Sequence, residues 1–513
     1  MALTLLMLPL RPSSSAKASN VEDSLIVGIQ STKTTVIRPL DPQERDMMSV
    51  YDLIYETLIV IDDNYLPAPG IAESWEMSNN GRNWTFHLRS GVTFSDGTPL
   101  RAGDVVATAQ YILNRASSEN SDPGYYANLN YFVDRISAPD DQTVEVRAKS
   151  GRSYWALLYA MTFPVLPAAY VDADNPPGSG AYCIDRFEPM SYLSLTPNPY
   201  WWQNPPQVKN IMFQMNNTQQ DVIEDYEYAR VDTIFTRAIA AAQYKSGTSS
   251  LSMDYRTNQL EILLMNQSSW RLSSLGVRRA IRFAIDVDRI ASNAYMGMVV
   301  RTDTPMISGT WMYNDGLTGY FRVDLDEARR LLEEEGWRDI DDDGYLEIAH
   351  NGQTEKLTLR LDYYEEPENS VRVETANFIA DSLKGIGIQV VINARSMSDM
   401  PQRLSAGNFD LALVSFAMDV CPDPGFLLMS GNTGNYGRYR SSRMDTLFKE
   451  LRAATNQQDY QQKLYEIQAQ FAEDCPFICL FYRSGTVLTR RMYTTVRDVR
   501  ELQLLKGIES FRN

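Results

Sequence analysis

The length, composition and charge of the chain exclude several classes of protein. Its 513 residues are 44% hydrophobic and 22% charged, which suits a globular protein with more than one core and not a disordered tail. The net charge of −17 and the lack of a basic stripe argue against a nucleic-acid partner, because nothing would displace counterions from phosphate. No internal run has the roughly 18 apolar residues of a membrane helix.

Residues 1–20 predict a signal-like or anchoring segment. Residues 2–10 (ALTLLMLPL) are about as long as the apolar region of a signal peptide, and Ala16-Lys17-Ala18 has the small-x-small form of a cleavage site. The basic residues that usually precede such a region are missing, so an uncleaved anchor or an unstructured tail stays open. The segment predicts an extracytoplasmic location, in a periplasm or at the outer face of the cell membrane.

The first half of the chain carries strand and turn signals. Residues 24–30 (SLIVGIQ) predict a first strand, and two short strands are predicted over 85–89 and 92–94. An Asp96-Gly97 turn follows, and a helix begins after it, since Gly tolerates the positive φ that such turns require. The segment 172–180 (DADNPPGSG) is the strongest loop signal of the chain and a candidate domain boundary.

From about residue 259 onward strands and helices alternate, which predicts an α/β domain. Helices are predicted over 277–285, 324–335 and 368–384, and strands over 357–363, 388–392 and 409–416. The near-continuous apolar run of 409–416 (FDLALVSF) is typical of a strand buried on both faces of a parallel sheet. Because open α/β sheets bind ligands beyond the carboxyl ends of their strands, Asp419 is a candidate ligand-binding residue.

The sequence lacks the motifs of catalysis and of cofactor binding. Its two histidines, His87 and His350, have no zinc-ligand spacing, and no nucleophile elbow, phosphate loop or dinucleotide fingerprint is present. We therefore expect no enzyme and no cofactor, although a secreted hydrolase with a carboxylate pair stays open as an alternative. The cysteines are expected to be buried thiols, because Cys475 and Cys479 on one strand would lie about 13 Å apart.

One acidic turn has the spacing of a calcium loop. Asp339, Asp341 and Asp343 precede Gly344, as the alternating carboxylates of such a loop do. His350 stands where the bidentate glutamate of that loop belongs, so a plain acidic hairpin turn stays open. The turn is a weak calcium candidate.

A second acidic cluster, Glu365, Glu366 and Glu368, follows the strand predicted over 357–363. It is either a solvated face or a group that prefers positively charged ligand side chains at the carboxyl edge of the sheet. Glu366 is therefore a second candidate ligand-binding residue.

Residues 69–105 resemble the signature of the family 5 extracellular solute-binding proteins, the peptide, dipeptide and nickel receptors of ABC importers. The family pattern runs A-x-S-W, then T-F-x-L-R-x-G-V-x-F-x-D-G-x-P, then A-x-D-V. This sequence matches it at Ala72, Ser74, Trp75, Thr85, Phe86, Leu88, Arg89, Gly91, Val92, Phe94, Asp96, Gly97, Pro99, Ala102, Asp104 and Val105. The departures are Arg101, where the family usually has a helix-capping Thr, and Gly103. Residues 178–182 (GSGAY), 277–290 and 326–337 are similar to further family patterns.

This resemblance implies a two-lobed, periplasmic-binding-protein-like α/β clamp of type II, the three-domain peptide-binding type. The implied boundaries are one lobe from 21–50, 166–257 and 482–513, an inserted domain of that lobe from 51–165, and a second lobe from 258–481. Two chain crossings, near 255–260 and 479–484, would form the hinge.

The resemblance also implies how a ligand binds. In peptide-binding relatives an Asp after the strand that matches 409–416 holds the α-ammonium of the peptide, a role carried over to Asp419. Phe416 stands in the position of the usual aromatic Trp, and Tyr436 is expected to bind ligand as well. Dipeptide-specific relatives place an Arg for the ligand carboxylate where this chain has Glu365 and Glu366. That departure favours a longer or basic peptide, or another cationic solute.

The resemblance implies a receptor, expected to be monomeric, that delivers oligopeptides to an ABC permease in the membrane. A receptor for a nickel chelate, an opine or a sugar, and a ligand sensor that feeds a signalling partner, stay open as alternatives.

Overall fold

In the computed structural model, the described residues are 24–41, 44–78, 81–118, 124–245, 251–366, 370–490, 499–505 and 507–508. The expected signal-like segment lies outside these ranges. Within them, no helix combines the length and the apolar character needed to cross a bilayer.

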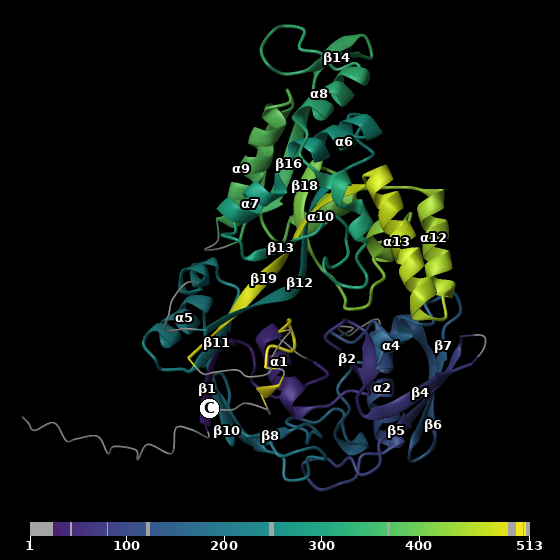
Figure 1. Cartoon of the computed structure of the whole chain (residues 1–513), viewed down its shortest axis with the longest axis vertical. Coiled ribbons are helices and arrows are strands. Elements are labelled where there is room, and N and C mark those ends of the chain that lie inside the picture. The colour runs from purple at the N-terminus through teal and green to yellow at the C-terminus, as the bar shows by residue number, and fades with distance from the viewer. Residues whose placement is uncertain are drawn as a thin grey trace, which may run out of the picture.

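Two lobes are joined by a pair of long strands, as Figure 1 shows. The lower lobe holds residues 24–245 and 499–508, and the upper lobe holds residues 266–476. Strands β12 (Leu251–Met265) and β19 (Phe477–Thr489) run side by side from one lobe into the other. Their ladder shifts register between Arg256 and Leu260, and such bulges let strands bend and twist locally. The expected two-lobed α/β clamp is confirmed, and the domain boundaries stay predictions.

One mixed sheet continues through both lobes. In spatial order its strands are β17 (Gln389–Arg395), β16 (Thr358–Tyr364), β18 (Leu411–Ala417), β12, β19, β11 (Thr233–Thr236), β1 (Ser24–Gln30), β10 (Asn210–Asn216), β9 (Tyr192–Pro197) and β8 (Tyr182–Glu188), with β13 (Val299–Arg301) beside β19. β16 pairs in parallel with β17 and β18, whereas β18 pairs antiparallel with β12. β18 is therefore buried in a mixed sheet, not in the purely parallel one that the sequence predicted.

The lower lobe carries the signature segment in its own small sheet. This sheet has the order β4 (Ala72–Met77), β5 (Asn83–Leu88), β7 (Thr143–Ala148) and β6 (Val133–Asp140), and a short pair β2 (Ile59–Ile61) and β3 (Pro67–Pro69) lies apart. Phe86 and Phe94 of the signature are almost wholly buried. The predicted strand 92–94 is wrong, because this segment makes only a bridge from Thr93 to Pro99 within a turn. The signature thus contributes buried side chains to the core of this lobe.

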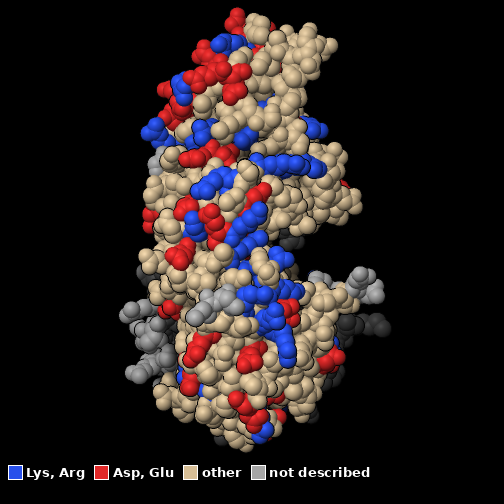
Figure 2. Space-filling model, turned by 90° about the vertical axis from the view of Figure 1, so that its right-hand side faces the viewer, with Lys and Arg blue, Asp and Glu red and all other residues tan. Residues whose placement is uncertain are grey.

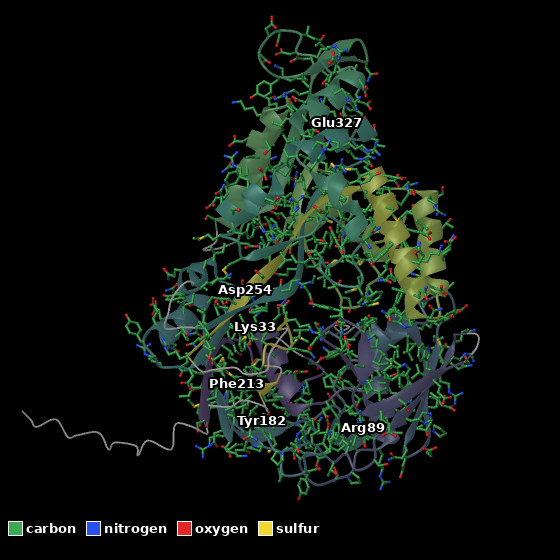
Figure 3. The ribbon with its side chains drawn as sticks, viewed as in Figure 1. Lys33, Arg89, Tyr182, Phe213, Asp254 and Glu327 are labelled. Atoms are coloured by element: carbon green, nitrogen blue, oxygen red, sulfur yellow. The ribbon has the colours of Figure 1, made fainter. Side chains whose placement is uncertain are left out.

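Helices complete the lower lobe. They are α1 (Arg45–Ile54), α2 (Ala102–Ala116), α3 (Leu129–Phe132), α4 (Leu157–Ala160), α5 (Gln219–Glu227) and the 3-10 turns Ala168–Tyr170 and Ile239–Tyr244. At the start of α2 the Arg101 backbone N–H donates to the Asp104 carboxylate at 2.8 Å, so Asp104 caps the helix although the usual capping Thr is absent. Tyr182 and Phe213, labelled in Figure 3, are fully buried in this lobe.

Helices of the upper lobe cover the other half of the sheet. They are α6 (Leu275–Ala284), α7 (Val287–Asn293), α8 (Leu325–Glu334), α9 (Val371–Lys384), α10 (Met400–Ala406), α11 (Gly425–Leu428), α12 (Ser442–Ala453) and α13 (Gln457–Asp474), with the 3-10 segment Asp315–Phe321 and the hairpin β14 (Glu347–His350) and β15 (Gln353–Lys356). The predicted start of α8 is confirmed, because Asp324 accepts a hydrogen bond from the Glu327 N–H at 3.0 Å.

The sequence predicted that the cysteines are thiols and interpreted Cys475 and Cys479 as members of one strand. All four cysteines are free thiols, and Cys475 ends α13 in a left-handed conformation instead of lying on a strand with Cys479.

On the face shown in Figure 2, lysine and arginine side chains form a band through the middle of the molecule, while acidic side chains gather toward its upper end. Folding thus brings together basic residues that form no stripe in the sequence.

Candidate functional site

A cavity of about 310 Å³ lies between the two lobes. Its wall is drawn from α1, β2 and residues 125–128 of the lower lobe, from residues 256–258 of β12, from residues 417–420 beyond β18, and from residues 500–503 near the C-terminus. The open-sheet rule predicted a ligand site beyond the carboxyl end of β18, and this cavity lies there.

The lobes touch beside the cavity through aromatic side chains. Trp155, just before α4, packs against Trp311 and Tyr460 of the upper lobe with ring centroids 5.5 and 5.2 Å apart. The Trp311 indole N–H donates to the Tyr65 carbonyl at 3.1 Å. These contacts join the two lobes beside the cavity.

Asp419 lies in the cavity wall and is held by neutral groups. The side-chain amide of Asn128, from the lower lobe, donates to its Oδ2 at 2.7 Å, and the Cys421 backbone N–H donates to its Oδ1 at 3.1 Å. The side chain is exposed to the cavity, yet protein crowds it from both lobes. The loss of bulk water raises the pKa of Asp419, and the hydrogen bonds from Cys421, Asn128 and Val420 act in the opposite direction. Among the described residues, no cation pairs with this carboxylate.

Binding of an ammonium group at Asp419 is expected to depend on pH. A cation beside the carboxylate lowers its pKa, so binding releases the proton that the raised pKa of the free protein retains. The affinity for an ammonium group should be highest at pH values above the raised pKa of Asp419, and it should fall as the pH drops through that pKa. Isothermal titration calorimetry across pH 4 to 8 measures this, and a pH-independent affinity would contradict it. Asp419→Asn should remove the dependence.

Phe416 and Tyr436 lie next to the segment that carries Asp419. Their rings stack with centroids 6.3 Å apart, and Phe426 meets Phe416 edge-on at 6.0 Å. Neither Phe416 nor Tyr436 is among the cavity-lining residues of the described chain. In this structure Phe416 and Tyr436 therefore lie beside the loop that carries Asp419 and do not line the cavity.

The structure pairs Glu366 with arginines instead of leaving it open to a ligand. Its carboxylate accepts from Arg372 Nε at 2.8 Å and from Arg483 Nη2 at 2.7 Å. The same two arginines bind Glu261, at 2.9 and 2.6 Å. The arginines keep the pKa of Glu366 below its usual value, against the effect of burial, which would raise it. Glu366 is also absent from the described cavity wall, and its role in ligand binding stays a prediction.

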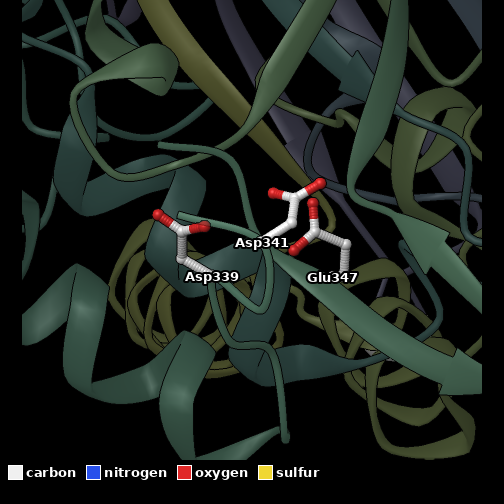
Figure 4. Close-up of side chains that lie close together, drawn as sticks. All are labelled: Asp339, Asp341 and Glu347. Atoms are coloured by element: carbon white, nitrogen blue, oxygen red, sulfur yellow. The ribbon is translucent and has the colours of Figure 1, made fainter. Parts of the chain in front are cut away.

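A lysine side chain, Lys356 of β15, lies against the acidic turn. Asp339, Asp341 and Glu347 bring carboxylate oxygens together, as Figure 4 shows. The Lys356 ammonium forms an ion pair with Asp343 and lies 3.2 Å from Glu347 Oε1. Calcium binding at Asp339, Asp341 and Asp343 stays a prediction, and Lys356 would have to leave before an ion could enter.

The sequence argument missed several residues of the cavity. Asn128, Tyr125, Arg256, Arg500 and Glu501 all line it, although they come from three separate parts of the chain. No local motif marks any of them, and their common feature is their position in the fold.

This fold and this cavity define a two-lobed solute-binding protein. The family model described as bacterial extracellular solute-binding proteins, family 5 Middle, matches residues 67–438, and the chain belongs to this family.

Known relatives are distant but span nearly the whole chain. The oligopeptide-binding protein AppA of Bacillus subtilis is 21% identical, over 89% of this chain and 86% of its own. The periplasmic oligopeptide-binding protein OppA of Escherichia coli is 24% identical, over 87% and 85%. The crystal structure of NikA from Brucella suis in complex with Fe(III)-EDTA superposes with a TM-score of 0.79 at 18% identity, over 95% of this chain and 99% of that one.

Proposed function

We propose that this protein is an extracytoplasmic receptor that binds peptides between its lobes and delivers them to the membrane component of an ABC importer. The observation that carries this proposal is Asp419, a carboxylate in an interlobe cavity whose hydrogen-bond partners among the described residues are neutral donors. An enclosed carboxylate of this kind suits an α-ammonium group, and oligopeptide-binding relatives support that ligand class.

Ligand-driven closure of the two lobes follows from the fact that both lobes contribute residues to the site. Asp419 belongs to the upper lobe and Asn128, which binds it, to the lower lobe. A ligand shifts an opening equilibrium only by its difference in affinity for the two states, so contacts to both walls are what drives closure. The protein thus acts by binding and not by catalysis, and the closed form is the one recognised by the permease.

Native mass spectrometry of the purified protein tests this proposal. Mixed-sequence libraries of dipeptides, tripeptides and pentapeptides are added, and the mass of any retained solute is read directly. We expect peptide adducts together with a higher unfolding temperature, because a ligand that binds only the folded state stabilises it. Binding of none of the libraries would contradict the proposal, and the appearance of cleaved products would favour a hydrolase.

A further inference from the structure

Some of the charged side chains that line the cavity form ion pairs with each other, and others do not. Arg45 is neutralised by Glu501, whose Oε1 lies 2.8 Å from Arg45 Nη1. Arg256 and Arg500 also line the cavity, but neither forms an ion pair with a carboxylate of the described chain. Among the described residues, these two guanidinium groups thus have no anionic partner, and Asp419 has no cationic one.

Both guanidinium groups lie against Tyr65 and are bonded to neutral acceptors. Arg256 Nη1 donates to the Ser308 carbonyl at 3.1 Å, and its guanidinium carbon is 5.7 Å from the Tyr65 ring centroid. Arg500 Nη2 donates to the Ile61 carbonyl and its Nε to Gln503 at 2.8 Å, with its guanidinium carbon 4.9 Å from the same ring. Arg500 is only 6% exposed, and its Nη1 has no hydrogen-bond partner within the described part of the chain. A buried donor of this kind costs free energy until it finds an acceptor.

The backbone holds the two arginines next to each other. Residues 256 and 500 form a parallel bridge, and the Glu501 N–H donates to the Arg256 carbonyl at 3.1 Å. The nearest carboxylate on this segment, Glu501, is occupied, because it also accepts from the Asn258 N–H at 2.9 Å and lies 3.4 Å from Arg237. Two adjacent like charges repel each other, and an anion between them removes that repulsion.

We propose that Arg256 and Arg500 form an anion subsite that binds the C-terminal carboxylate of a short peptide whose α-ammonium is held by Asp419. This inference rests on the proposed function and narrows its substrate class. The cavity of about 310 Å³ is at the small end of the usual range of roughly 300–1,000 Å³, which suits a dipeptide or tripeptide. The sequence favoured a longer or basic peptide because of Glu365 and Glu366, but Glu366 is neutralised by Arg372 and Arg483.

The test compares a tripeptide library with free C-termini and the same library as C-terminal amides. Affinities are measured by native mass spectrometry titration for the full chain and for the variants Arg256→Gln and Arg500→Gln. Arg329→Gln, an exposed arginine of α8 far from the cavity wall, is the matched control. We expect the free acids to bind at least about tenfold more tightly than the amides, as charged hydrogen bonds do. Arg256→Gln should largely remove this difference, and Arg329→Gln should keep it.

The other outcomes separate this inference from the proposed function. Equal affinity of acids and amides for the wild-type protein overturns the anion subsite while peptide binding stands. If neither tripeptide library binds, the anion subsite for short peptides fails, whereas the proposed function fails only if the dipeptide and pentapeptide libraries do not bind either. Should Arg500→Gln prevent folding, the comparison of acids and amides on wild type and Arg256→Gln still decides the matter. A preference for acids that survives in Arg256→Gln, and in a folded Arg500→Gln, would place the carboxylate elsewhere.

Discussion

Asp419→Ala is expected to abolish the stabilisation of the protein by peptides. Removing one partner of an enclosed charge pair typically weakens binding by about 2–5 kcal/mol, which is roughly 30-fold to several-thousand-fold in affinity. The ligand-free protein should not lose stability through the lost charge, because Asp419 has no cationic partner there and its pKa is raised by desolvation. Differential scanning fluorimetry and isothermal titration calorimetry with a library-selected peptide measure both effects.

Two variants control for shape and for total charge. Asp419→Asn keeps the shape of the side chain and one of the two oxygens that accept from Asn128 and Cys421, and it should lose nearly as much affinity as Asp419→Ala, because both lack the charge. Glu365→Gln removes an exposed carboxylate outside the cavity wall and should leave affinity unchanged. If the same peptide stabilises Asp419→Ala as much as wild type, Asp419 does not bind ligand.

Arg372→Met is expected to lower the free energy of unfolding by about 3–5 kcal/mol, because it leaves buried carboxylates short of a cation. Arg372 and Glu261 have side chains that are 1% and 0% exposed, and Arg372 also binds Glu366 and lies 3.8 Å from the Tyr364 ring centroid. Of the two arginines that pair with both carboxylates, Arg483 would remain after the substitution. Urea unfolding followed by circular dichroism measures the change.

The double variant Arg372→Met with Glu261→Gln separates lost pairing from lost packing. It should recover part of the stability, because no unpaired charge remains at residue 261. Arg329→Gln, which breaks an exposed ion pair with Asp326, should change stability by no more than about 0.5 kcal/mol. Equal unfolding midpoints for Arg372→Met and Arg329→Gln would show that the buried network contributes little.

Several elements could be predicted from the sequence because their signals are local. The strand 24–30 has its predicted bounds, and the capped start of α8 follows from Asp324 and the backbone of Glu327. The strand before Asp419 was also predicted, since an apolar run of that length has few other conformations. The strand predicted at 92–94 failed because three residues flanked by Gly91 and Asp96-Gly97 fit a turn equally well.

The binding site was predictable only in part. Asp419 follows a recognisable strand, so a general rule about sheet edges indicated its place. Arg256 and Arg500 are adjacent only because the C-terminal segment returns to β12, 244 residues later in the chain (500 − 256). Glu366 was interpreted as an available charge because a sequence does not show that Arg372 and Arg483 face it.

The sequence by itself determined the family, the α/β clamp and the acidic residue at the end of a buried strand, because each depends on residues that are close in the chain. Only the tertiary structure decided which charges are neutralised and which remain available to a ligand. The physical reason is that a charge is compensated by whatever lies within a few ångströms in space, and long-range packing of strands and loops sets those distances.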